Sequence, residues 1–128
     1  MLRIHFTAAD LGLLRLALEA DPLWESPLLW RSEFLSVLSL YHRKKLINYD
    51  EAILALDYAQ RLIGTREHKV SLEAVVDLAF HSSCSSYDCE FIALAKTLGT
   101  KLITYDKQML QQFPAIAIKP EDYLVQSK

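Results

Sequence analysis

The stretch that decides the fold is residues 86–106, SYDCEFIALAKTLGTKLITYD. Ser86 is placed to cap a helix and Gly99 to end it, and the apolar residues between them recur at helical spacing. Residues 101–105 then have the composition of a short buried strand, and Asp106 follows them at once. The segment therefore predicts a helix packed against a strand, which is the repeating unit of an α/β domain.

The rest of the chain continues this alternation. Asp21-Pro22 stops a first helix, because a residue before proline is pushed out of the α region, and Asn48 and Glu51 have the spacing of a capping box. We expect helices over 8–20, from 31 to near 43, from 48 up to 64, from 71 through 79 and over 108–112, strands over 26–29 and 115–118, and a terminal turn over 121–124. The expected fold class is α/β, with a mainly parallel central sheet flanked by helices on both faces.

Length and composition predict a single domain spanning residues 1–128. Hydrophobic residues make up 52% of the chain and charged residues 23%, with only 3 Gly and 4 Pro, which is the composition of a packed globule. The sequence has no leader pattern and no membrane-length apolar run, so we expect a cytoplasmic protein without a membrane partner. Cys84 and Cys89 lack a second ligand pair at zinc spacing and are expected to be buried, reduced thiols.

The net charge of -2 disfavours a simple basic-patch binder of nucleic acid, because it supplies no general attraction to phosphate. Glycine-rich phosphate loops, nucleophile elbows and zinc-protease helices are absent from the sequence, and its histidines have no ligand-like spacing. A phosphoacceptor receiver domain also clusters acids at strand ends, but it needs an acidic pair after its first strand, and residues 1–7 contain no acid. That alternative therefore ranks low.

Three acids stand where a parallel sheet gathers ligands. Glu33 and Asp106 follow predicted strands, and Asp88 lies in the first turn of a predicted helix. Any one of them has a structural explanation, because acids are favoured in first helical turns by about 0.3 to 1 kcal/mol. Together at one sheet edge they would repel one another and need a cation, and oxygen ligands favour Mg²⁺ or Mn²⁺. Such a site suits phosphodiester hydrolysis.

Three ordered motifs, PLLWRSEF at 27–34, SYDCEF at 86–91 and LITYD at 102–106, resemble PIN-domain proteins of the VapC toxin type. The resemblance implies a metal-dependent endoribonuclease that is neutralised by a cognate antitoxin and forms a homodimer or higher oligomer. It assigns catalysis and metal binding to Glu33, Asp88 and Asp106. The supporting residues that we expect are Thr104 and Ser86, and candidate cations for the RNA backbone are Arg31, Lys101 and Lys107.

The departure from the family lies at the front of the chain. Family members open with a central apolar strand that ends in Asp, whereas this sequence opens Met1-Leu2-Arg3-Ile4-His5-Phe6-Thr7, so one strand and a loop are expected to be missing and the domain to be truncated at its N-terminus. Asp10 is a poor substitute for the first acid, because it lies inside the first expected helix. A start site placed too far downstream and a decayed gene both explain the pattern. The alternative function is thus an inactive domain that binds an antitoxin or a like subunit.

A missing central strand would leave two rows of backbone N–H and C=O groups facing a gap. Each buried unsatisfied group costs roughly 1 to 3 kcal/mol, so the gap must be filled. Residues 1–6 alternate apolar and polar side chains and are the only local segment able to pair. We therefore expect the gap to be closed by this segment or by a strand from another copy.

Overall fold

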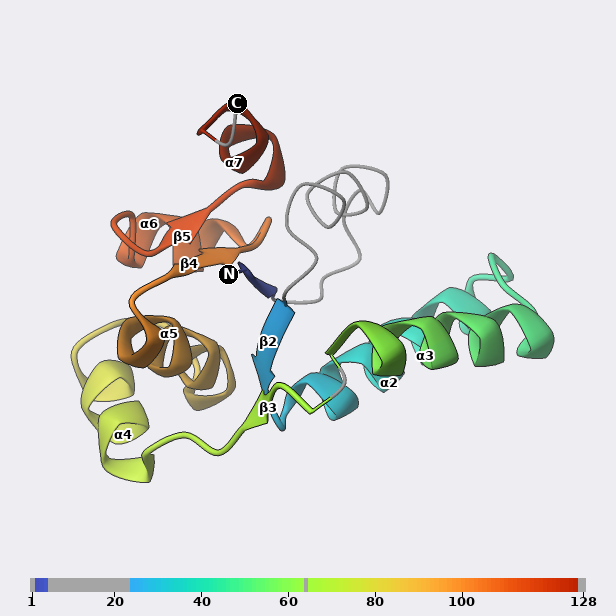
Figure 1. Ribbon diagram of the computed structural model, residues 1–128, viewed down its shortest axis with the longest axis horizontal. Helices are drawn as coiled ribbons and strands as arrows, with labels where there is room; N and C mark the ends of the chain where they lie inside the picture. The colour runs from blue at the N-terminus through green and yellow to red at the C-terminus, as the bar shows by residue number, and fades with distance from the viewer. Residues whose placement is uncertain (1, 5–23, 64, 127–128) are drawn as a thin grey trace.

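A parallel sheet with helices packed around it makes up the domain. The computed structural model describes residues 2–4, 24–63 and 65–126, and the sheet order is β3-β2-β1-β4-β5 with every pairing parallel (Figure 1). The strands are β1 (Leu2–Ile4), β2 (Trp24–Pro27), β3 (Glu67–His68), β4 (Lys101–Ile103) and β5 (Ala117–Ile118). The helices are α2 (Trp30–Arg43), α3 (Tyr49–Ile63), α4 (Leu72–Phe80), α5 (Ser86–Leu98), α6 (Lys107–Gln112) and α7 (Pro120–Gln126). The predicted α/β class and the parallel sheet are confirmed.

The centre of the sheet is strand β1. Leu2 lies opposite Trp24 of β2 on one side and opposite Lys101 of β4 on the other, so both rows of its backbone groups face a partner strand. The gap that we expected in the centre of the sheet is thus filled by residues 2–4 of this chain, as one of our two alternatives predicted. The expected helix over 8–20, with Asp10, lies outside the described residues.

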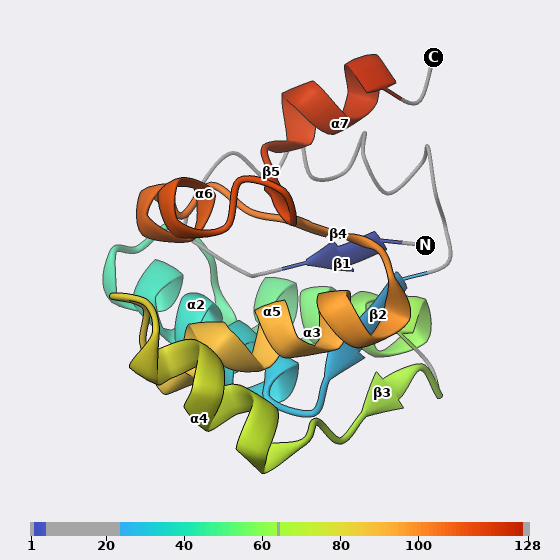
Figure 2. The same cartoon turned by 90° about the vertical axis from the view of Figure 1, so that its left-hand side faces the viewer.

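Helix α5 covers one face of the sheet and supplies half of the buried side chains of the main core cluster. It contacts β1, β2 and β4, while α4 packs against its other side. Figures 1 and 2 show α5 and α6 on opposite sides of β4, so this half of the sheet has a helix on each face. The core side chains packed here are Val75, Cys84, Cys89, Phe91, Ile92, Ala93, Ala95, Leu102, Met109 and Ala117. Each large apolar member contributes about 1.5 to 3 kcal/mol by leaving water.

Helices α2 and α3 lie together as an arm that projects from the sheet (Figure 1). Trp30, Ala59 and Ile63 form a small buried cluster at the base of the arm, and Phe34 packs against it. Among the described residues, no helix is long and apolar enough to cross a bilayer.

Local capping signals explain most of the helix boundaries. Asn48 and Glu51 form a reciprocal capping box at the start of α3, with N···O distances of 3.0 and 2.8 Å. The Ser71 hydroxyl accepts from Ala74 N–H at 3.3 Å. One prediction was wrong by one residue: Ser85, not Ser86, caps α5, and Ser86 is the first helical residue. Either hydroxyl suits the position, and the sequence alone does not fix the register of a cap between adjacent serines.

Strand β3 was not predicted. It has only two residues, both polar, so it lacks the apolar run that marks a strand. Its register places Ser26 opposite Glu67 and Pro27 opposite His68. His68 Nε2 lies 2.9 Å from Glu25 Oε1, which gives this buried glutamate a polar partner.

Gly99 offers a test of how α5 is connected to β4. Its φ of +63° is left-handed, and an added Cβ would meet nothing within 4 Å. Gly99→Ala should therefore lower the free energy of unfolding by roughly 1 to 2 kcal/mol through backbone strain alone, whereas Gly99→Asn should cost less because asparagine tolerates this region. Urea denaturation of the two variants measures the difference. Equal costs would show that the left-handed C-cap does not limit stability.

Candidate functional site

Glu33 is placed by the turn that joins β2 to α2. The helix begins at Trp30, directly after the strand and its two-residue turn, and the Glu33 N–H donates to Leu29 O at 3.1 Å. The carboxylate therefore sits in the first turn of α2, near the positive end of the helix dipole. Its side chain is half-buried. This is the position predicted from the sequence, after the carboxyl end of β2.

Asp106 follows β4 and begins α6. Its Oδ1 accepts from Met109 N–H at 2.9 Å, and its own N–H donates to Thr104 Oγ1 at 3.0 Å. Thr104 is fully buried, so its hydroxyl fixes the turn between the strand and the acid. The predicted cap is confirmed, and Thr104 supports the backbone of Asp106. One carboxylate oxygen of Asp106 thus has a structural role already.

Asp88 lies in the first turn of α5, where its N–H donates to Ser85 Oγ at 3.1 Å. A helix that precedes a parallel strand runs antiparallel to it, so the start of α5 lies at the same edge as the end of β4. The exposed Ser86 side chain has no contact that links it to the acids among the described residues. Its predicted supporting role stays a prediction, and the capping bond to Asp88 comes from Ser85.

The pKa of Cys84, a buried thiol in the loop between α4 and α5, is affected by the charges of two of the acids. Burial raises the pKa of Cys84, and the charges of Cys89, Asp88 and Asp106 raise it further. Gln108 Nε2 donates to Ser83 O at 2.6 Å and contacts Ser83 Oγ at 3.0 Å, which ties the start of α6 to the loop before α5. The segments that carry Asp88 and Asp106 are therefore held side by side.

Glu33, in the first turn of α2, lies near a different residue of α5, Glu90. Burial raises the pKa of Glu90, and the charge of Glu33 raises it further, so the first turn of α2 faces the first half of α5. The acids predicted from the sequence thus lie in the first turns of α2 and α5 and at the N-cap of α6. Within residues 2–4, 24–63 and 65–126, no three His, Cys, Asp or Glu side chains are already gathered as an ion-binding cluster.

The three predicted RNA-contacting cations have different surroundings. Arg31 makes a bidentate pair with Glu67, with both N···O distances 2.7 Å. Lys101 Nζ donates to Ala115 O at 2.7 Å, and Lys107 is an exposed residue at the start of α6. Arg31 and Lys101 therefore have structural partners, while contact with RNA stays a prediction for all three.

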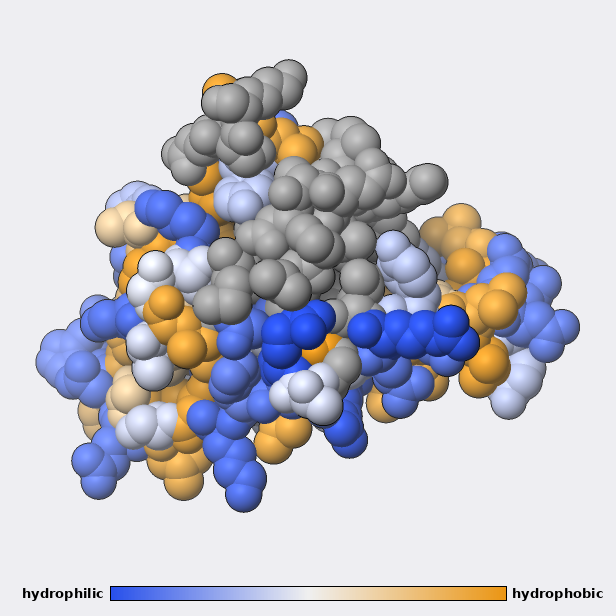
Figure 3. Space-filling view, in the orientation of Figure 1, coloured by the Kyte–Doolittle hydropathy of each residue, from blue (hydrophilic) through white to orange (hydrophobic). Residues whose placement is uncertain are grey.

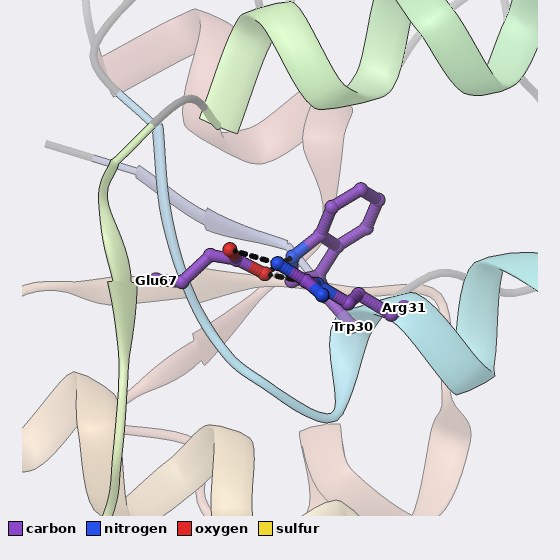
Figure 4. A network of polar contacts seen from close by, with 3 residues as sticks. All are labelled: Trp30, Arg31 and Glu67. Atoms are coloured by element: carbon purple, nitrogen blue, oxygen red, sulfur yellow. Dashed lines mark hydrogen bonds and ion pairs between the residues drawn. The ribbon is translucent and has the colours of Figure 1, made fainter.

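Sequence reasoning did not single out Glu67, which lies at the centre of the contacts around α2 (Figure 4). Hydrogen bonding from Arg31 lowers the pKa of Glu67, with burial opposing the shift. Because this folded-state pKa lies below the ordinary value, the pair adds stability above the ordinary pKa and loses it as pH falls through the lowered one. The signal in the sequence was weak, since the contacts span 36 and 37 residues.

Comparison with known proteins finds similarity both in sequence and in structure. No model of a protein family matches the sequence. The chain is 31% identical over 77 residues to Ribonuclease VapC3 of Pyrobaculum aerophilum, a match that covers 58% of this chain and 59% of that protein. The chain thus spans less than two thirds of the length of this relative.

The fold matches the crystal structure of PAE2754 from Pyrobaculum aerophilum with a TM-score of 0.76. The superposition covers 98% of this chain and 88% of that one, at 19% sequence identity. At this identity the likeness concerns the fold alone. The sequence match to Ribonuclease VapC3, by contrast, bears out the resemblance of this chain to VapC-type proteins.

Proposed function

We propose that this chain is a PIN-like, cytoplasmic endoribonuclease of the toxin type, dependent on Mg²⁺ or Mn²⁺, which hydrolyses RNA phosphodiesters. The observation that supports the proposal is that Glu33, Asp88 and Asp106 each lie at the start of a helix, α2, α5 and α6 respectively. The similarity to Ribonuclease VapC3 supports the choice of RNA as substrate. An acidic site of this kind binds phosphate only with the help of a cation.

The donor chemistry of the site fits a hard divalent cation. Carboxylate oxygens are the ligands that Mg²⁺ and Mn²⁺ prefer, and the three acids offer them from separate segments. A bound cation supplies a water of lowered pKa and offsets charge on the leaving oxygen. In this proposal Asp88 and Asp106 hold the cation from α5 and α6, and Glu33 closes the site from α2.

The protein's own groups orient these carboxylates. Capping by Ser85 fixes the turn that carries Asp88, and the buried Thr104 hydroxyl fixes the turn that carries Asp106. The unpaired N–H groups at the starts of the three helices favour negative charge, so they assist both the carboxylates and an approaching phosphate. Lys107, exposed beside Asp106, is the cation best placed to meet the RNA backbone.

A second candidate function is that of an inactive interaction module that binds an antitoxin or a like subunit. It is favoured by large apolar side chains exposed on the arm, among them Leu54 and Tyr58 of α3. Figure 3 shows apolar surface over the arm and over α4. In the proposed scheme the arm offers its apolar side chains to the antitoxin, and RNA binds at the acidic edge.

A cleavage assay with matched charge changes tests the enzyme proposal. The wild-type chain should cleave a structured RNA with Mn²⁺ and not with excess chelator, and the Glu33→Gln, Asp88→Asn double variant should be slower by on the order of a hundredfold or more. The control is Asp50→Asn, Glu73→Gln, which removes two exposed first-turn acids from α3 and α4. Equal rates for wild type and the Glu33, Asp88 variant would leave the interaction module as the function.

Asp106 caps α6 and is also a proposed cation ligand, so a test must separate these two roles. Asp106→Asn retains an oxygen for the α6 cap and should change stability by less than about 0.5 kcal/mol, yet it should abolish most cleavage because the charge is lost. Asp106→Ala should lose cleavage and also about 1 kcal/mol of stability. Urea denaturation alongside the cleavage assay distinguishes the two effects. Full activity in Asp106→Asn would remove this residue from the proposed site.

The proposed homodimer is assigned to one apolar face. Leu72, Val76 and Phe80 form a stripe along α4 and are 78%, 51% and 83% exposed. Such a stripe can pack against its own copy about a two-fold axis. Phe80→Ser should therefore shift the protein from dimer to monomer in light scattering, whereas Leu54→Ser on α3 should not. A monomeric wild type, or a dimer that survives Phe80→Ser unchanged, would contradict this assignment.

A further inference from the structure

The first turn of α2 is held in place by a side chain from strand β3. Leu29 at the N-cap makes no side-chain capping bond, so the helix lacks the usual local anchor. Instead, Glu67 of β3 accepts from Trp30 Nε1 at 2.6 Å and from Arg31 Nε and Nη2 at 2.7 Å each (Figure 4). We call these three side chains the Glu67 clamp.

The clamp fixes both the position and the rotation of the turn. Trp30 is buried and packs against Phe34, with ring centroids 6.0 Å apart, so the indole cannot swing without disturbing the base of the arm. Arg31 meets both carboxylate oxygens, a fork geometry that defines direction as well as distance. Two consecutive residues are thus bound to one carboxylate from β3.

Glu33 belongs to the same turn. Its N–H bonds to Leu29 O, so its backbone moves with the residues that the clamp holds. The clamp also occupies the Arg31 guanidinium, a cation two residues from Glu33 that would otherwise be available to the acids. The geometry around Glu67 therefore affects the carboxylate of Glu33 without touching it.

We propose that Glu67 is a positioning residue for the acidic site, holding the first turn of α2 so that Glu33 faces α5. This inference rests on the proposed function, because it assigns Glu67 to the site that Glu33 shares with Asp88 and Asp106. The clamp accounts for the ordered start of a helix that has no cap of its own. It also gives the short strand β3 a role beyond extending the sheet.

The test compares Glu67→Gln and Glu67→Ala with wild type. Glutamine keeps one acceptor for Trp30 or Arg31 but loses the charge, and alanine removes every contact. The control is Arg61→Gln, which breaks the exposed Asp57–Arg61 pair on α3, 3.0 Å in length. Two readouts are needed: Mn²⁺ affinity by calorimetry without RNA, and hydrogen exchange at the backbone amides of residues 31–34.

We expect Mn²⁺ affinity to fall about threefold in Glu67→Gln and about tenfold in Glu67→Ala, with faster amide exchange in the same order. Arg61→Gln should match wild type in both readouts. A merely structural role would lower the unfolding midpoint but leave the Mn²⁺ affinity of the folded protein unchanged, and that result would overturn the proposal. The mild glutamine variant keeps the test valid if alanine prevents folding.

The two readouts also distinguish a failure of the proposed function from a failure of the clamp. If wild type binds no Mn²⁺, the metal-dependent enzyme is excluded, and amide exchange then decides on the clamp alone. Unchanged exchange at residues 31–34 in both Glu67 variants would show that the clamp does not hold the turn. Faster exchange there, and not in Arg61→Gln, would retain the clamp as the anchor of α2.

Discussion

The backbone pairing of β1 between β2 and β4 is the constraint on which the rest of the structure depends. Leu2 and Arg3 pair with a strand on each side and Ile4 pairs with β4, and without these residues two central rows of N–H and C=O groups would be unsatisfied. Helix α5 then packs across β1, β2 and β4. Because Asp88 lies in the first turn of α5 and Asp106 follows β4, the position of these acids depends on the continuity of the sheet.

The sequence predicted elements whose signals are local. The capping box of Asn48 and Glu51, the Ser71 cap and the left-handed Gly99 all appear where the spacing indicated, because each depends on atoms within a few residues. Strand β3 escaped prediction because two polar residues carry no strand pattern. Its existence depends on pairing with β2, a contact made across some forty residues of chain.

The same distinction applies to the candidate site. The positions of Glu33, Asp88 and Asp106 at helix starts followed from strand ends and first turns, whereas the groups that orient them did not. Ser85 differs from the predicted cap by one residue, Gln108 contacts a loop 25 residues away, and Glu67 reaches across 36 residues. Sequence motifs identify the candidate acids, but the supporting contacts arise only when distant segments pack together.

The buried thiols give the region around Asp88 a chemical reporter of its own. Cys84 and Cys89 are the only cysteines in the chain, both are free and buried, and burial raises the pKa of each. A thiol reagent needs an exposed thiolate, so it can label these residues only while the start of α5 is transiently open. The labelling rate under native conditions therefore measures how often this end of the helix opens, and no probe has to be introduced.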